Sequence, residues 1–179
     1  MEHEWTCSIC GASHEGVPLS WGFDEPIYWD WLTNEERAAG HCGADLCWFT
    51  GDDGDLAQFV RGTIELPILD AVDPDEDSFI IGVWASLSEA NFNRYVNDPD
   101  AGADEQGEAW FGWLSNRIPV YENTLNLKTN VYLRGKRLRP LIQVQPSDHR
   151  LSSDVHEGIT LNRARGLGER WLHLERPAS

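Results

Sequence analysis

The order of hydrophobic and polar positions along the chain predicts strands in its middle part. Residues 56–68 form the longest strand-like stretch, and residues 79–84 are apolar on both faces, as expected of a central strand that is covered on each side. An acidic loop at 70–77 separates the two stretches, which together predict a hairpin at the centre of a sheet. A shorter strand is predicted at residues 45–50.

The same pattern predicts a second hairpin and several helices. Residues 126–133 and 138–144 flank a basic turn, an arrangement typical of a hairpin. Thr33 and Glu36 have the spacing of a capping box, in which hydroxyl and carboxylate each accept a hydrogen bond from a free backbone N–H. Residues 108–114 are compatible with a helix or a strand. Helices are predicted at residues 27–32 and 34–39. A further helix is predicted from a cap at Ser86 or Ser88 to about residue 96, and a last one, capped by Thr160, from residue 161 to about residue 175.

This pattern predicts the α+β fold class, because helices lie towards both ends and long crossover connections between parallel strands are scarce. We expect a single domain over residues 1–179, with a central, mostly antiparallel sheet and flanking helices. Residues 1–50 are expected to form a zinc-knuckle-like N-terminal segment that packs on the sheet and helices of residues 51–179.

The charge of the chain narrows the classes of partner. The chain contains 14 basic and 30 acidic residues, which gives a net charge of −16. Such a surface repels nucleic acid and anionic membranes, and it steers a basic protein partner towards the chain. The simpler interpretation is that acidity keeps the protein soluble.

The N-terminal residues predict a cytoplasmic protein. Residues 1–4 lack the basic region and apolar run of a signal peptide, and no apolar run approaches the roughly 20 residues of a membrane-spanning helix. In the cytoplasm, the four cysteines are expected to be metal ligands or free thiols rather than disulfides.

The strongest chemical signal is the C-x-x-C motif of Cys7 and Cys10. Two intervening residues place both sulfurs on one side of a tight turn, and Gly11 allows the backbone to fold beneath them. A structural zinc ion needs four ligands, so the motif supplies half of a site. Cys42 and Cys47 are the candidates for the other half, in a site with four thiolates.

Other interpretations of these cysteines remain open at this point. His14 or His41 can replace Cys42 as a zinc ligand, and the cysteines can also be free thiols or a redox pair. A thioredoxin-like motif requires the C-x-x-C to open a helix. Gly11 and Gly16 follow the motif closely and argue against a helix there.

Other clusters of polar residues have structural explanations. Residues 73–77 begin like a calcium loop, but Ser78 and Trp84 stand where glycine and glutamate are required. Ser147, Asp148 and His149 are sequence neighbours, which cannot adopt the geometry of a catalytic triad, so capping of a helix by Ser147 or Asp148 is expected instead. The basic cluster from Arg134 to Arg139 is interpreted as an offset to nearby acidic loops, and the tryptophan-rich segments at 29–31 and 110–113 as core or a binding face.

Several motifs spread along the chain resemble one uncharacterised bacterial family, catalogued as domain of unknown function 2199. They are Cys7-x-x-Cys10-Gly11-x-x-His14-x-Gly16-x-Pro18, Asp45-Leu46-Cys47, Phe59-Val60-Arg61-Gly62, Gly82-Val83-Trp84, Pro146-Ser147-Asp148-His149 and Gly158-Ile159. The resemblance implies a bacterial cytosolic domain and brings no activity or catalytic residue. It also implies that Cys47 is a fixed position and Cys42 is not, which makes Cys7, Cys10, Cys47 and His14 an alternative ligand set.

We therefore expect a zinc-stabilised protein-interaction module, for example an immunity-type protein that masks a basic toxin. The alternative is a metal-dependent hydrolase with an open zinc site near the knuckle. The sequence favours a role without catalysis, because it contains no recognisable catalytic set. A closed site with four protein ligands favours the module, and an open site in a cleft favours the enzyme.

Overall fold

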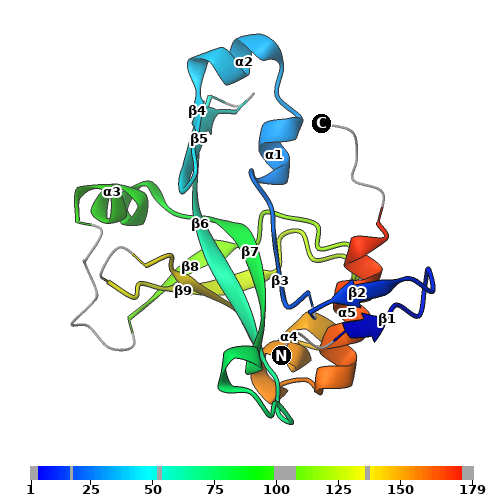
Figure 1. Cartoon of the computed structure of the whole chain (residues 1–179). Coiled ribbons are helices and arrows are strands. Elements are labelled where there is room, and N and C mark those ends of the chain that lie inside the picture. Colours follow the sequence, from blue (N-terminus) through cyan, green and yellow to red (C-terminus); the bar gives the residue numbers. More distant parts are fainter. Residues whose placement is uncertain (1–3, 17, 52–53, 99–107, 136–137, 175–179) are drawn as a thin grey trace.

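The chain folds into a sheet flanked by helices, with a small separate hairpin at its N-terminus (Figure 1). The structure is a computed structural model that describes residues 4–16, 18–51, 54–98, 108–135 and 138–174. In chain order the elements are β1 (Glu4–Thr6), β2 (Ser13–Glu15), β3 (Ser20–Gly22), α1 (Ile27–Asp30), α2 (Asn34–Ala39), β4 (His41–Cys42), β5 (Leu46–Thr50), β6 (Leu56–Pro67), the 3-10 turn η1 (Pro74–Glu76), β7 (Ser78–Ser86), α3 (Glu89–Asn97), β8 (Ala109–Trp113), β9 (Lys128–Tyr132), β10 (Leu141–Val144), α4 (Arg150–Glu157) and α5 (Leu161–Leu172).

The antiparallel pair β6–β7 forms the centre of the sheet, as the sequence predicted (Figure 1). The register runs from Phe59 opposite Ser86 to Pro67 opposite Ser78 without interruption. Between residues 61 and 66, partly exposed and buried side chains alternate strictly. Successive side chains of a strand point to opposite faces, so this alternation places one row of β6 side chains in the core.

The sheet is mixed, which corrects the expectation of a mostly antiparallel sheet. Its strand order is β3-β7-β6-β10-β9-β8, with β5 attached to β6 and β4 to β5, and both β3–β7 and β6–β10 are parallel pairs. Each parallel pair is joined by a connection that carries several other strands or helices. The sequence pattern did not predict these pairs because no single crossover helix marks them.

The sheet curls so that its far edge returns to β7. An isolated bridge pairs Ala85 of β7 with Leu114, the residue that follows β8. Beside it, Ser115 N donates to Trp84 O (2.8 Å), and Trp84 N donates to Asn116 Oδ1 (2.7 Å). Trp84 and Leu114 are completely buried at this contact. The outer edge of the last strand, β8, therefore lies against β7.

Strand β6 changes its second neighbour at Gly62. Residues 56–60 pair with β5, whereas Thr63 N donates to Pro140 O (2.9 Å) at the start of β10. A Cβ atom on Gly62 would lie 2.6 Å from Pro140 O and 2.6 Å from Ile142 Cδ1. Glycine is therefore required here by the close approach of β10.

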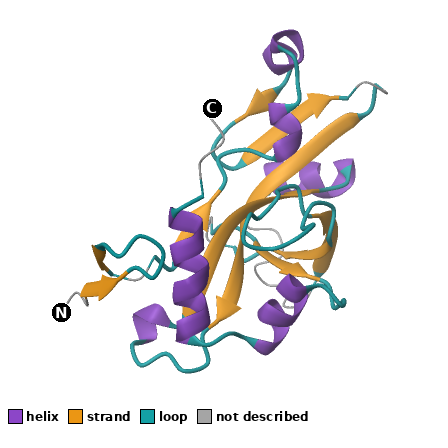
Figure 2. Cartoon of the chain, turned by 90° about the vertical axis from the view of Figure 1, so that its right-hand side faces the viewer, coloured by secondary structure: helices purple, strands orange, loops and turns teal. Residues whose placement is uncertain are grey.

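Two hydrophobic cores lie on this sheet. The larger one includes side chains of the sheet together with Leu151 and Val155 of α4 and Ala164 and Leu167 of α5. In Figure 2, α5 stands in front of the sheet, and the β1–β2 hairpin extends to one side of it. A second, smaller core contains the side chains of Cys47, Phe49, Phe59 and Trp84.

A buried carboxylate links the two C-terminal helices to the loop after β8. Asp154 of α4 is 1% exposed and accepts a hydrogen bond from Tyr121 Oη (2.7 Å). Arg163 Nε of α5 donates to the same carboxylate (3.0 Å), and Arg150 Nε lies 2.9 Å from its other oxygen. Burial, with the hydrogen bond to Asp154, raises the pKa of Tyr121 above its ordinary value. The network compensates the buried charge, which would otherwise be costly.

The predicted helix starts are confirmed at the level of single hydrogen bonds. Thr33 and Glu36 form the predicted capping box of α2. The Ser88 hydroxyl caps α3, and the Thr160 hydroxyl caps α5. The ambiguous stretch at 108–114 contains the strand β8. Local capping chemistry is therefore well predicted by this sequence.

Two acidic side chains, Glu25 and Asp30, share a hydrogen bond at α1. Burial, this hydrogen bond and the negative charge of Asp30 raise the pKa of Glu25 from 4.5 to about 7, while the nearby Arg37 opposes the shift. The Glu25 carboxyl group therefore keeps its proton at pH values where most glutamates are ionised.

We predict that Gly62→Ala lowers the free energy of unfolding by about 1–3 kcal/mol, because the added methyl group overlaps the Pro140 carbonyl and the Ile142 side chain. Gly166→Ala in α5 is the matched control: a Cβ atom added at Gly166 would meet no atom within 4 Å, and alanine is the better helix former by about 1 kcal/mol. Urea denaturation of both variants measures the difference. Equal stabilities would show that β10 does not approach β6 this closely.

We also predict that the contribution of Glu25 to the free energy of unfolding decreases as pH rises. The unfolded chain releases this proton near pH 4.5 and the folded chain near pH 7, so the free energy of unfolding decreases across that window. The shift corresponds to about 3 kcal/mol at most, and partial exposure reduces it to about 1 kcal/mol. Glu25→Gln is expected to remove this decrease in urea denaturation at pH 4.5–8, and Glu35→Gln on α2 is expected to keep it. Parallel curves for wild type and Glu25→Gln would contradict the account.

Candidate metal centre

The N-terminal hairpin holds the C-x-x-C motif in the turn between β1 and β2. Its register places Trp5 opposite His14. Two backbone bonds close the turn: Cys7 N donates to Ala12 O (2.9 Å), and Gly11 N donates to Cys7 O (2.9 Å). Gly11 has a φ of +70°, a left-handed conformation that glycine adopts without steric cost. The tight turn predicted at this glycine is therefore present.

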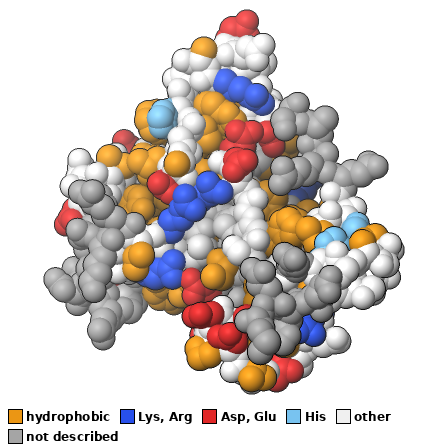
Figure 3. Space-filling model, viewed as in Figure 1, with side chains coloured by type: hydrophobic (Ala, Val, Ile, Leu, Met, Phe, Trp, Pro, Cys, Tyr) orange, Lys and Arg blue, Asp and Glu red, His pale blue; other side chains and the backbone are white. Residues whose placement is uncertain are grey.

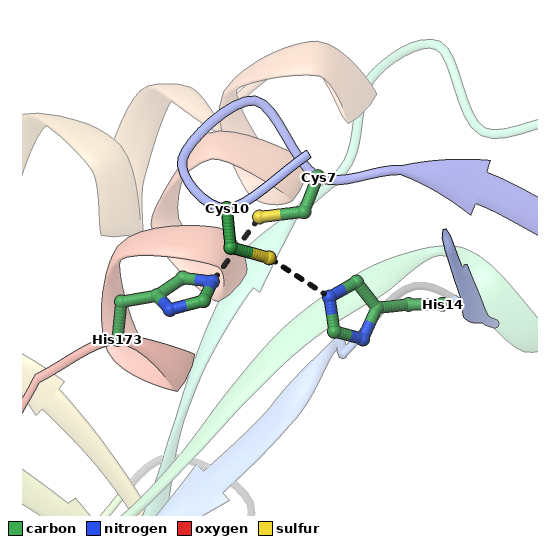
Figure 4. Close-up of side chains that lie close together, drawn as sticks. All are labelled: Cys7, Cys10, His14 and His173. Atoms are coloured by element: carbon green, nitrogen blue, oxygen red, sulfur yellow. Dashed lines mark hydrogen bonds between the residues drawn. The ribbon is translucent and has the colours of Figure 1, made fainter. Parts of the chain in front are cut away.

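Four side chains that can bind a metal meet beside this turn (Figure 4). They are Cys7, Cys10 and His14 of the hairpin, and His173 directly after α5. One donor atom from each lies within 4.8 Å of all the others. Cys7 Sγ lies 3.2 Å from His173 Nε2, and Cys10 Sγ lies 3.6 Å from His14 Nε2.

The two histidines are positioned by their local surroundings. The ring of Trp5 stacks on the ring of His14 at 5.1 Å between centroids, and Trp5 Nε1 donates to Gly16 O. His173 ends α5, where its backbone N–H donates to Arg170 O (3.3 Å). One histidine is therefore fixed by the hairpin and the other by a helix end.

A polar contact holds the hairpin against α5 next to the cluster. Ser8 N donates to Glu169 Oε1 (3.3 Å), and the Ser8 hydroxyl also donates to the Glu169 carboxylate. Glu169 precedes His173 by four residues, so the two side chains lie on the same face at the end of the helix. This contact brings His173 to the two cysteines.

The geometry of the cluster fits a zinc ion. In a tetrahedral site with Zn–S bonds of about 2.3 Å and Zn–N bonds of about 2.0–2.1 Å, sulfur and nitrogen ligands are about 3.6 Å apart. Two sulfur–nitrogen pairs, Cys7 with His173 at 3.2 Å and Cys10 with His14 at 3.6 Å, are near this value. Two thiolates also balance the charge of Zn²⁺, and imidazole and thiolate are ligands that zinc favours. Bound here, zinc would supply a tetrahedral cross-link.

The structure places the other predicted ligands elsewhere. Cys42 and Cys47 face each other across the β4–β5 hairpin, and Cys47 is completely buried in the smaller core. A hydrogen bond to Cys42 and burial both raise the pKa of the Cys47 thiol. His41 stacks on Trp48 at 4.2 Å between ring centroids. Of the predicted ligands, the structure thus brings together Cys7, Cys10 and His14.

His173 was not among the ligand candidates from the sequence. It is 166 positions away from Cys7, and the segment around it has the pattern of an amphipathic helix end. The single signal that could have indicated it was a histidine placed at a predicted helix end. Only the packing of α5 and the hairpin reveals that this side chain completes the cluster.

The remaining polar motifs have structural roles. His149, and not the predicted Ser147 or Asp148, caps α4 by accepting a hydrogen bond from Leu151 N (3.1 Å). In the basic cluster, Arg134 pairs with Glu65 (2.7 Å), and Arg139 pairs with Asp45 (2.8 Å). The two residues between them, at 136 and 137, lie outside the described part of the chain. Asp73 caps the turn η1.

Fold and site together define an α+β domain that carries a surface cluster of two cysteines and two histidines. The chain belongs to the family described as "Uncharacterized protein conserved in bacteria (DUF2199)", whose model matches residues 6–159. Three of the cluster residues lie within this range, and His173 lies beyond it. The resemblance noted in the sequence is thereby confirmed.

Two further comparisons gave no relatives: neither the search of curated proteins nor that of solved structures found a match. Within the described ranges, none of the helices combines the length and the apolar character needed to cross a membrane.

We predict that the purified chain binds one zinc ion and that His173→Ala weakens this binding. Loss of an outer-sphere partner of a metal ligand costs about 10–100-fold in affinity, so loss of a direct ligand should cost at least as much. Titration with a zinc-sensitive dye and native mass spectrometry measure the affinity and the stoichiometry.

Two matched controls separate the cluster from the other candidates. His41→Ala and Cys42→Ser remove a histidine and a cysteine that lie outside the cluster, and both are expected to retain zinc. If Cys42→Ser released zinc while His173→Ala retained it, the four-residue cluster would not be the metal centre.

Proposed function

We propose that the chain is a zinc-stabilised interaction module that binds a basic protein partner. The observation that carries the proposal is the number of donors in the cluster of Cys7, Cys10, His14 and His173. Four protein ligands fill the coordination sphere of a tetrahedral zinc ion and leave no position for a reacting water. Closed sites of this kind stabilise folds.

Zinc would stabilise the part of the fold that needs it most. The β1–β2 sheet pairs only three residues with three, and a two-stranded hairpin of that size is marginal by itself. Zinc bound to the cluster would join this hairpin to the end of α5. At a free zinc concentration 100 times the Kd, binding adds about 2.7 kcal/mol to the free energy of unfolding.

The surface that best suits such a partner is the turn between β6 and β7. Leu69 and Val72 are 69% and 94% exposed there. Four exposed aspartates surround them, at positions 70, 73, 75 and 77. Figure 3 shows acidic and hydrophobic side chains together at the bottom of the molecule, where Figure 1 places this turn. Apolar side chains within an acidic rim suit a basic partner with apolar anchors.

Hydrolysis by a zinc-bound water is the alternative, and the cluster counts against it. Such an enzyme keeps one coordination position open, so only three of the four donors could bind the metal. Two surface depressions among the described residues are lined by the segment between β8 and β9, the second also by residues 148–150, Arg163 and Arg170. Neither includes a cluster member. A protein that kept zinc and fold after His173→Ala would favour the hydrolase instead.

We predict that the immobilised, zinc-loaded chain retains a basic protein from bacterial lysate at low salt and releases it at high salt. Val72→Ser combined with Asp75→Asn should reduce the retained amount at least about tenfold, which corresponds to 1.4 kcal/mol of binding free energy. Quantitative mass spectrometry of the eluate measures the retention.

The matched control changes the same types of side chain on α3. Val96→Ser combined with Glu89→Gln alters the charge by the same amount on another exposed surface, and it should leave retention unchanged. Equal losses for the two double variants would show that general charge, and not the β6–β7 turn, retains the protein. A lack of any basic protein at low salt would contradict the proposal.

A further inference from the structure

Cys42 and Cys47 form a second cysteine pair that the metal centre does not use. They occupy directly opposite positions in the antiparallel pair β4–β5. The two side chains lie close enough for Cys42 to raise the pKa of the Cys47 thiol. Both are free in this structure. Two thiols at opposite positions of one hairpin are candidates for a disulfide.

The turn of this hairpin determines how the two cysteines face each other. Gly43 N donates to Leu46 O (2.9 Å), which makes these two residues a hydrogen-bonded pair. Because such pairs alternate along an antiparallel ladder, Cys42 and Cys47 form a non-hydrogen-bonded pair, in which Cα atoms are about 4.5 Å apart and side chains are closest. Disulfides span Cα separations of about 4.4–6.8 Å, so the register permits one here without a shift of the strands.

The two thiols differ in their access to solvent. Cys42 is half-buried, so a small reagent can reach its sulfur. Cys47 is 0% exposed and packs among Phe49, Phe59 and Trp84. The partly exposed Cys42 is therefore the thiol that reacts with an external molecule, and the buried Cys47 can react only with Cys42.

We propose that Cys42 and Cys47 are a redox modification site that forms a reversible cross-strand disulfide by exchange with a small soluble disulfide of the glutathione type. The Cys42 thiolate attacks one sulfur of the small disulfide, which forms a mixed disulfide and releases one small thiolate. The Cys47 sulfur then attacks the Cys42 sulfur, and its proton passes to the released thiolate. The second small sulfur leaves as a thiolate and takes up the proton that Cys42 had lost to water. Two protein thiols are oxidised, and one small disulfide is reduced to two thiols.

The surrounding fold makes the oxidised hairpin compatible with the rest of the structure. Strand β5 stays paired with residues 56–60 of β6, and α2 packs closely on it, since a Cβ on Gly40 would lie 2.8 Å from Trp48 O. The disulfide would join β4 to β5 within this packed corner. The site is independent of the metal centre, whose own two cysteines belong to a different hairpin.

The test exposes the zinc-loaded full chain to buffers with increasing ratios of oxidised to reduced glutathione. Remaining thiols are then alkylated under denaturing conditions, and the chain is cut before aspartate. Asp45 lies between the two cysteines, so the fragments that contain Cys42 and Cys47 separate unless a disulfide joins them. Mass spectrometry is expected to find the joined fragments, two hydrogens lighter than their sum, and a reductant is expected to separate them.

Variants test the order of the two steps. In Cys47→Ala, Cys42 should accumulate as a stable mixed disulfide with glutathione, because no neighbouring thiol resolves it. In Cys42→Ser, Cys47 should remain unreacted, because the core covers it. Cys10→Ser, which alters the metal centre, should still form the joined fragments.

Three results would overturn the proposal. They are full alkylation of Cys42 and Cys47 in the most oxidising buffer, a stable mixed disulfide on Cys42 of the wild-type chain with Cys47 still alkylated, and a Cys7–Cys10 disulfide in place of the Cys42–Cys47 disulfide.

Discussion

Strand β6 is the constraint on which the rest of the structure depends. It pairs with β7 along one side, and on the other side it pairs first with β5 and then, after Gly62, with β10. Both cores form against it, because Val60 and Ile64 belong to the larger one and Phe59 to the smaller one. The exchange of partners at Gly62 allows one twelve-residue strand to organise a sheet of eight. Strand β5, which carries Cys47, pairs with the first half of β6, and β4 with Cys42 pairs with β5.

The cluster of Cys7, Cys10, His14 and His173 depends on the same sheet at longer range. Strand β3, which follows the N-terminal hairpin, pairs with β7, and α5 packs on the larger core. The hairpin and the end of α5 therefore meet at one edge of the molecule, where Ser8 and Glu169 fix their contact. A metal bound to Cys7 and His173 would connect two segments that the sheet has already brought close, so little further ordering is required.

The sequence predicted those features that depend on neighbouring residues. The capping box of Thr33 and Glu36 and the turn at Gly11 follow from the chemistry of a few adjacent positions. Features that depend on distant segments were not predictable in this way. The parallel pairs β3–β7 and β6–β10 join strands that are far apart in the sequence. His173 reaches the cysteines only because α5 packs beside the N-terminal hairpin. Cys42 and Cys47 were predicted to complete the metal site of Cys7 and Cys10. In the structure they face each other on the β4–β5 hairpin instead.

The most direct test of the central claim is X-ray absorption spectroscopy at the zinc edge of the purified, zinc-loaded chain, because it counts the sulfur and nitrogen ligands. We expect two sulfur ligands at about 2.3 Å and two nitrogen ligands at about 2.0–2.1 Å, from Cys7, Cys10, His14 and His173. Four sulfur ligands, or three with one nitrogen, would require Cys42 or Cys47 at the metal and would contradict the metal centre described here.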